Sequence, residues 1–202
     1  MMGTIHIAGV IPRIGTTTLA MQLVTFLKNF EYKACYVEMC RQDYIWGVSN
    51  VYEGVTVDRA TGRTTYAGID MYGKDRLNAL LNGQIGDYDY IVCDYGHIGD
   101  SAFDTNAYAA GDAEIILCGN KPNEIFKTED MLSDTMFDDA ITVFNFTDPA
   151  DYNAILDMME KRGPQTKFMP FIPDPFSTLK DYVKEDFLQS LMDLVVEKMN
   201  LG

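Results

Sequence analysis

The sequence is poor in basic residues, and this shortage argues against two classes of partner. It has 16 lysines and arginines against 30 aspartates and glutamates, so its formal net charge is −14. A surface this negative repels the phosphate backbone of nucleic acids and the head groups of anionic lipids. The composition therefore disfavours direct binding to nucleic acid and binding to a membrane.

The chain also lacks long apolar runs and paired cysteines. No apolar stretch approaches the roughly 18–20 residues needed to cross a bilayer, and residues 1–4 show no sign of a secretory signal. No C-x-x-C pair occurs among the four cysteines, which are Cys35, Cys40, Cys93 and Cys118. Free thiols in a reducing compartment explain them better than disulfides or a zinc site. We therefore expect a cytoplasmic protein.

The apolar residues that are present suffice for one domain over residues 1–202. They make up 47% of the chain, which supports a sizeable core. Six short apolar runs recur, at residues 4–8, 34–37, 90–93, 114–118, 141–144 and 167–171. Their nearly continuous hydrophobicity is typical of strands buried on both faces of a parallel sheet.

Segments with helical signals separate these runs. Residues 17–30 carry an apolar stripe at spacings of three and four. Asp148 and Pro149 predict the start of a helix that runs to about Arg162, and a last helix is expected over residues 184–200. This alternation predicts a doubly wound, mostly parallel α/β sheet with helices on both faces.

One insertion, at about residues 55–72, breaks the alternation. Residues 55–66 have the pattern of a β-hairpin that turns at residues 60–62. The hairpin is either a surface excursion or an edge on which a protein partner docks.

The first strand leads through a glycine-containing turn into the first helix, at residues 9–18. Backbone N–H groups at such a helix N-terminus form a natural site for an anion. We expect a phosphate to contact Gly9, Ile14, Gly15, Thr16, Thr17 and Thr18. The hydroxyl of Thr16 or of Thr17 is also a candidate ligand of a phosphate or of Mg²⁺.

This turn departs from the consensus G-x-x-x-x-G-K-[ST]. With Gly15 as the second glycine, the first falls on Val10 and the lysine falls on Thr16. Loss of that lysine typically removes a few kcal/mol of transition-state stabilisation in phosphoryl transfer. Arg13 is the only cation inside the turn and is the candidate to replace it, so we expect an ATPase that is weak at most.

Polar residues follow four of the apolar runs. They are Glu38, Asp94, Asn145 and Asp174, and the carboxyl ends of parallel strands meet at one edge of a sheet. Asp94 stands where an Mg²⁺ shell needs a carboxylate. The predicted metal site therefore combines Thr17 and Asp94. His97, close behind, has no evident carboxylate partner, and we expect no catalytic role for it.

From Ile5 to about Phe176, the chain resembles the ParA/MinD-like (SIMIBI-class) branch of P-loop NTPases, and its segments follow the family's order. Its Walker A motif is degenerate. The resemblance implies ATP or ADP with Mg²⁺ as cofactor. It further implies that Glu38 is a water-positioning acid, and that the base lies beside Asn145, Pro173 and Asp174.

The resemblance has two further departures. The family's signature lysine, which reaches across a dimer, would fall on Ile11, and a second acid would fall on Cys40. The expected function is thus a slow or inactive ATPase switch in partitioning, positioning or mobile-element maintenance, with a protein partner or as a homodimer. The alternative is a pseudo-NTPase scaffold that binds protein partners without nucleotide. A small-molecule phosphotransferase is a third reading, but no cationic lid is visible beyond Arg59 and Arg63.

Overall fold

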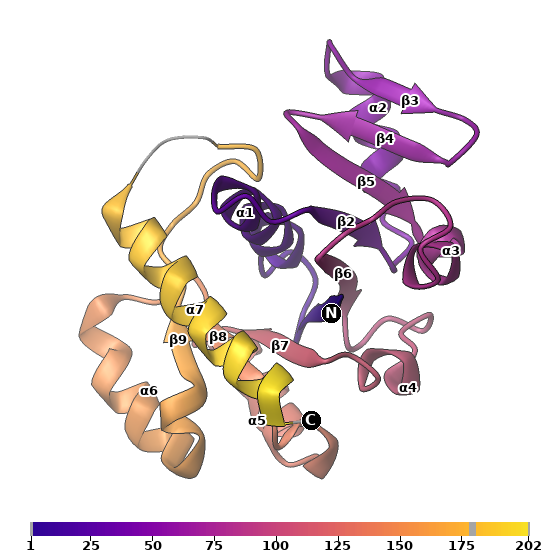
Figure 1. Ribbon diagram of the computed structural model, residues 1–202. Coiled ribbons are helices and arrows are strands. Elements are labelled where there is room, and N and C mark those ends of the chain that lie inside the picture. The colour runs from indigo at the N-terminus through magenta and orange to yellow at the C-terminus, as the bar shows by residue number, and fades with distance from the viewer. Residues whose placement is uncertain (1, 178–180, 202) are drawn as a thin grey trace.

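The computed structural model describes residues 2–177 and 181–201, which are built around one nine-stranded sheet (Figure 1). The strand order is β3-β4-β5-β2-β6-β1-β7-β8-β9. The strands are β1 Gly3–Gly9, β2 Ala34–Glu38, β3 Thr56–Asp58, β4 Arg63–Tyr66, β5 Ile69–Gly73, β6 Tyr90–His97, β7 Ala113–Cys118, β8 Ile141–Phe144 and β9 Thr166–Phe168. The pairs β3–β4 and β4–β5 are antiparallel, and the other pairs are parallel.

Helices connect most of the strands. The α-helices are α1 Thr16–Asn29, α2 Tyr44–Val51, α3 Leu77–Leu81, α4 Thr105–Tyr108, α5 Pro122–Leu132, α6 Tyr152–Met159 and α7 Tyr182–Leu201. Short 3₁₀ turns are η1 Lys74–Arg76, η2 Thr135–Phe137, η3 Pro149–Asp151 and η4 Glu160–Gln165. In the described residues, no helix is both long enough and apolar enough to span a membrane.

Two buried apolar clusters cover the two faces of the sheet. Successive strand residues alternate between them, so Ile7 belongs to one cluster and Ala8 to the other. Residues of α1, α2 and α7 join the first cluster, and residues of α3, α4, α5 and α6 join the second. The predicted doubly wound, mostly parallel sheet with helices on both faces is therefore confirmed.

The six predicted strands are all present, with differences at their ends. β6 continues to His97, so Asp94 lies within the strand instead of following it. β9 ends at Phe168, three residues earlier than expected, because Pro170 has no backbone N–H to continue the ladder. The predicted helix up to about Arg162 is an α-helix only over Tyr152–Met159. Glu160 takes a left-handed φ of 46°, which interrupts the α-helical hydrogen bonds and leaves a 3₁₀ turn over the remaining residues.

The predicted hairpin forms, and it extends the main sheet. β3 pairs with β4 up to Asp58 and Arg63, β4 pairs with β5, and β5 pairs in parallel with β2. Figure 1 shows these strands at the end of the sheet opposite α6. The ring of Phe176, from the segment after β9, packs against Tyr44, Tyr52 and Tyr66, with centroid distances of 6.4, 5.7 and 4.8 Å.

Candidate functional site

Residues 9–18, here called loop 9–18, comprise the last residue of β1, the connection at residues 10–15 and the first three residues of α1. Both glycines of this segment are required by close approach. A Cβ on Gly9 would lie 2.3 Å from Cγ2 of Ile14. Gly15 has a φ of 105°, and a Cβ there would lie 2.5 Å from Nδ2 of Asn145. A side chain at either position would have to displace Ile14 or Asn145, and the positive φ of Gly15 adds backbone strain for any other residue.

The N-terminus of α1 opens into a cavity of about 530 Å³, here called the loop cavity. Its lining combines Arg13, Gly15, Thr16, Thr17 and Thr18 from the start of α1 and the loop before it with Gln42, Tyr44, His97 and Asp100 from other parts of the chain. Arg13 is exposed, with a left-handed φ of 62°. The loop cavity thus presents a helix N-terminus, three hydroxyl groups and a cationic side chain to a ligand.

Asp94 lies directly behind this cavity and is completely buried. Its Oδ2 accepts hydrogen bonds from the Thr17 hydroxyl at 2.5 Å and from the Tyr36 hydroxyl at 3.0 Å. Its Oδ1 accepts from the backbone N–H of Gly96 at 2.9 Å. Burial raises the pKa of the Asp94 carboxyl, whereas these hydrogen bonds act to lower that pKa. The carboxyl group therefore holds the Thr17 side chain at the cavity wall.

These residues suit Mg²⁺, the metal that the fold family implies. The Thr17 hydroxyl lines the cavity and offers an oxygen atom, the ligand type that Mg²⁺ prefers, while Asp94, buried behind it, accepts the proton of that hydroxyl. The phosphates of a nucleotide would supply other oxygen ligands. In the described residues, no group of three His, Cys, Asp or Glu side chains is placed to hold a metal ion by itself. The site therefore fits a metal that arrives with a phosphate ligand.

Glu38 is paired in register with Asp94, but its carboxylate caps a helix. Its two oxygens accept from the backbone N–H groups of Tyr44 at 2.7 Å and Ile45 at 3.2 Å, at the start of α2. The formal N-cap residue, Asp43, makes no side-chain capping bond. Burial raises the pKa of Glu38, and the two backbone hydrogen bonds oppose this shift.

Asn145 is nearly buried, with 3% of its surface exposed, and it holds loop 9–18 in place. Its Nδ2 donates to the carbonyl of Ile14 at 2.8 Å, and its Oδ1 accepts from the N–H of Phe146 at 2.9 Å. Both polar atoms of the side chain are therefore engaged by the protein itself. Its predicted contact with a base would require that arrangement to change.

Pro173 and Asp174 lie apart from this buried group, on an exposed segment. Oδ1 of Asp174 accepts from the backbone N–H of Phe176 at 2.8 Å. The side chain of Gln22, on α1, donates to the carbonyls of Pro175 at 2.7 Å and Ser177 at 3.2 Å. The segment around Asp174 is thus attached to α1, the same helix that begins in loop 9–18.

The structure therefore brings together Glu38, Asp94, Asn145 and loop 9–18 at one edge of the sheet. Sequence reasoning missed Tyr36, Gln42, Tyr44 and Asp100 and gave no site role to His97. Tyr36 precedes Glu38 by two residues in β2, so both face the same side of the sheet. His97 and Asp100 follow Asp94 closely in sequence, which was a usable signal for them.

Comparison with known proteins shows a likeness at the level of fold. No family model matches the chain, and no curated protein matches it. The MinC:MinD cell division protein complex of Aquifex aeolicus is similar at 16% identity over 98% of this chain and 96% of that chain, with a TM-score of 0.64. A ParA family ATPase from Chlorobium tepidum is similar at 14% identity over 99% of each chain, with a TM-score of 0.60.

A third solved structure carries a nucleotide. It is the septum site-determining protein MinD complexed with Mg-ADP, from Pyrococcus horikoshii, with 15% identity over 98% of this chain and 96% of that chain, and a TM-score of 0.57. At identities of this size the shared feature is the fold, which is that of ParA/MinD-like P-loop proteins.

Proposed function

We propose that this protein binds ADP or ATP with Mg²⁺ in the loop cavity and acts as a slow or inactive ATPase switch. The phosphates would contact the N–H groups and hydroxyls of loop 9–18, with Thr17 at the metal and Asp94 holding Thr17. The base would lie toward Pro173 and Asp174. Asn145 would contact the base only after breaking its hydrogen bond to Ile14 or to Phe146.

The observation that carries this proposal is the hydrogen bond from Thr17 to Asp94 beneath the N-terminus of α1. A threonine oxygen, a buried carboxylate and a helix N-terminus meet at the wall of a cavity of about 530 Å³. This combination suits a phosphate-bound Mg²⁺ better than a neutral ligand. The solved structure with Mg-ADP has the same fold.

Two features support slow hydrolysis, and a third, Arg13, partly opposes them. Thr16 and Ile11 occupy the positions where the resemblance expects lysines, so less positive charge faces the phosphate that would be transferred. Glu38 uses both carboxylate oxygens on backbone N–H groups of α2, which leaves it poorly placed to orient a water molecule. Arg13 is the cation that lines the cavity and would partly replace the lysines.

A switch of this kind would act through protein partners, in partitioning, positioning or mobile-element maintenance. The similar structures include a ParA family ATPase and a complex between MinC and MinD. We therefore expect a protein partner, or a second copy of the chain, to bind according to which nucleotide is present.

Calorimetry with ADP and ATP, each with and without Mg²⁺, tests the proposal. We expect Thr17→Val to weaken binding of the Mg²⁺-nucleotide by about tenfold or more, because it removes a metal ligand and the contact with Asp94. Thr25→Val is the matched control, since Thr25 lies on the same helix and its hydroxyl donates to the carbonyl of Met21. Binding that is unchanged in Thr17→Val would place the ligand elsewhere.

The alternative function is a pseudo-NTPase scaffold, and the engagement of Asn145 and Glu38 by the protein itself favours it. A scaffold would show no change in thermal stability with millimolar nucleotide while retaining a stable protein partner. A nucleotide-binding protein would instead be stabilised by about 2.7 kcal/mol at a ligand concentration of a hundred times Kd.

A further inference from the structure

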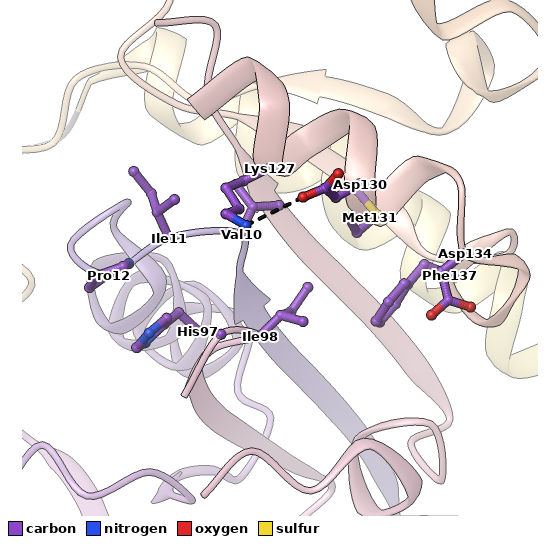
Figure 2. A pocket seen from close by; sticks show the side chains of 11 residues that line it. Val10, Ile11, Pro12, His97, Ile98, Lys127, Asp130, Met131, Asp134 and Phe137 are labelled. Atoms are coloured by element: carbon purple, nitrogen blue, oxygen red, sulfur yellow. Dashed lines mark hydrogen bonds and ion pairs between the residues drawn. The ribbon is translucent and has the colours of Figure 1, made fainter. Parts of the chain in front are cut away.

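A second concave site lies beside loop 9–18, next to α5. It has a volume of about 360 Å³ and is here called the α5 pocket. Figure 2 shows its lining, which comes from residues 10–12 of the loop, from His97 at the end of β6 and the two residues after it, from α5 and from the following turn. Pro12 and His97 line both this pocket and the loop cavity, so the two sites adjoin each other.

The inner lining of the α5 pocket is apolar. Val10, Met131 and Phe137 are 5%, 5% and 4% exposed, and Ile98 is half-buried at one wall. An engineered apolar cavity of roughly 150 Å³ is large enough to bind benzene. The α5 pocket therefore has room for an aromatic ring and a short substituent.

Ile11 completes the apolar wall, at the position where the sequence resemblance expects a lysine. Its side chain lines the pocket and packs against both apolar clusters of the fold. A lysine there would place an ammonium group among apolar side chains. Because Ile11 stands there instead, this side of the loop is apolar and can contact an apolar group of a ligand.

The rim of the pocket is acidic. Lys127 forms an ion pair with Asp130 at 3.3 Å, and Oδ1 of Asp134 accepts from the N–H of Met136. These three side chains carry one positive and two negative charges, and His97 is the other titratable group of the lining. Together with the net charge of −14, this rim attracts a cationic ligand and repels a phosphate.

The walls are held in place before any ligand arrives. The N–H of Val10 donates to the carbonyl of Leu117 in β7 at 2.9 Å, and the N–H of Ile98 donates to the carbonyl of Gly9 at 2.9 Å. A pocket that is already formed requires little ordering when its ligand binds.

We propose that the α5 pocket, walled by Ile11, Met131 and Phe137 and rimmed by Asp130 and Asp134, binds a small molecule with an aromatic body and a protonated amine. The ring would occupy the apolar interior and the ammonium group would lie at the acidic rim. This pocket adjoins the loop cavity at Pro12 and His97, but its test uses no nucleotide and is therefore independent of the proposed function.

The test uses 2-phenylethylamine as probe and 3-phenylpropionate as its anionic counterpart of similar size. Methyl NMR of ¹³C-labelled methionine reports the location, because Met131 lies in the pocket whereas Met199 packs against the other apolar cluster. We expect a saturable shift of the Met131 methyl signal with a Kd on the order of 1 mM, as is usual for a ligand this small. The Met199 signal should not move.

Two variants separate the contributions of the wall and the rim. Ile11→Lys should weaken binding of the amine about tenfold or more, because it places a like charge beside the ligand. The control Val57→Lys, on exposed β3, should bind the amine like the parent. Asp134→Asn keeps the acceptor for Met136 and should reduce the preference for the amine over the acid.

Three results would overturn the proposal. One is binding of 3-phenylpropionate as tight as that of the amine. Another is binding of the amine in the wrong place, shown by an unchanged Met131 signal or by equal affinity for the parent and for Ile11→Lys. The third is self-association that Ile11→Lys abolishes while neither probe binds, which would assign the pocket to a second copy of the chain.

Discussion

Asn145 and His6 are buried polar side chains whose hydrogen bonds join distant parts of the chain. Asn145 lies 131 residues from its acceptor, the carbonyl of Ile14. Nδ1 of His6, in β1, donates to the carbonyl of Tyr108 at 2.8 Å, and its ring lies against those of Tyr95 and Tyr108. Because carbonyl oxygens only accept, Nδ1 must carry the proton in this contact.

Asn145→Ala should lower the free energy of unfolding by about 1–3 kcal/mol, because it leaves the buried carbonyl of Ile14 without its donor. Chemical denaturation without nucleotide measures this loss. Asn82→Ala is the control, since Asn82 is exposed and its side chain bonds only one turn back, to Asn78. Equal losses in the two variants would show that Asn145 does not hold loop 9–18.

His6 should make the protein less stable in weak acid. Burial lowers the pKa of His6 in the folded protein, while the contact with Tyr108 and the charge of Asp112 act to raise it. The unfolded chain, with a histidine pKa near 6.5, then binds the proton more readily than the folded chain. The contribution of His6 is therefore complete above about pH 6.5 and declines as the pH falls below that value.

NMR titration of His6 measures this pKa directly, and denaturation at about pH 7.5 and about pH 5.5 measures its effect on stability. The parent should lose more stability between these two pH values than His6→Gln does. The comparison isolates His6 from the buried carboxyl groups, which both proteins share. Identical losses would contradict the prediction.

At the scale of elements, α2 depends on a residue outside it. It has eight residues, a length at which an isolated helix is marginal. Its N-terminal N–H groups are capped by Glu38, from the end of β2. This contact joins the start of α2, and with it Tyr44 at the loop cavity, to the strand that lies beside Asp94.

Glu38→Ala should therefore lower the free energy of unfolding by about 1–2 kcal/mol, because two N–H groups lose their acceptor and the helix dipole loses a nearby negative charge. Glu53→Ala, at an exposed site just beyond α2, serves as the control. The loss should appear in the absence of nucleotide, which distinguishes capping from a role in hydrolysis. A Glu38→Ala protein as stable as the control variant would rule out the capping role.

At the scale of the whole molecule, the order of the strands decides which residues meet. β1 lies between β6 and β7, so loop 9–18 leaves the sheet between the ends of two neighbouring strands. The loop cavity and the α5 pocket both border this loop, and Pro12 and His97 line both of them. The two sites therefore adjoin each other at the point where the loop leaves the sheet.

The sequence by itself determined the kind and order of the main strands and of the first and last helices, whereas α2, α3, α4 and α5 were not predicted from it. Apolar runs, helix caps and glycines act over a few residues, and these local signals sufficed for the six predicted strands, for α1 and α7, and for the hairpin. They also placed Glu38 at the end of β2, whereas Asp94, expected just after a strand, lies within β6 and is paired there with Ile7 and Glu38. The signal was weakest over residues 149–165, where the backbone conformation of Glu160 limits the α-helix.

Only the tertiary structure decided what those residues contact. The bond from Thr17 to Asp94 spans 77 positions, and that from Asn145 to Ile14 spans 131. The α5 pocket combines Ile11 with residues more than a hundred positions away. Such contacts depend on the lateral order of the strands and on which face each helix covers. Short-range sequence patterns do not predict the order of the strands or the face that each helix covers. Both are selected by the free energy of burying the two faces of the sheet at once.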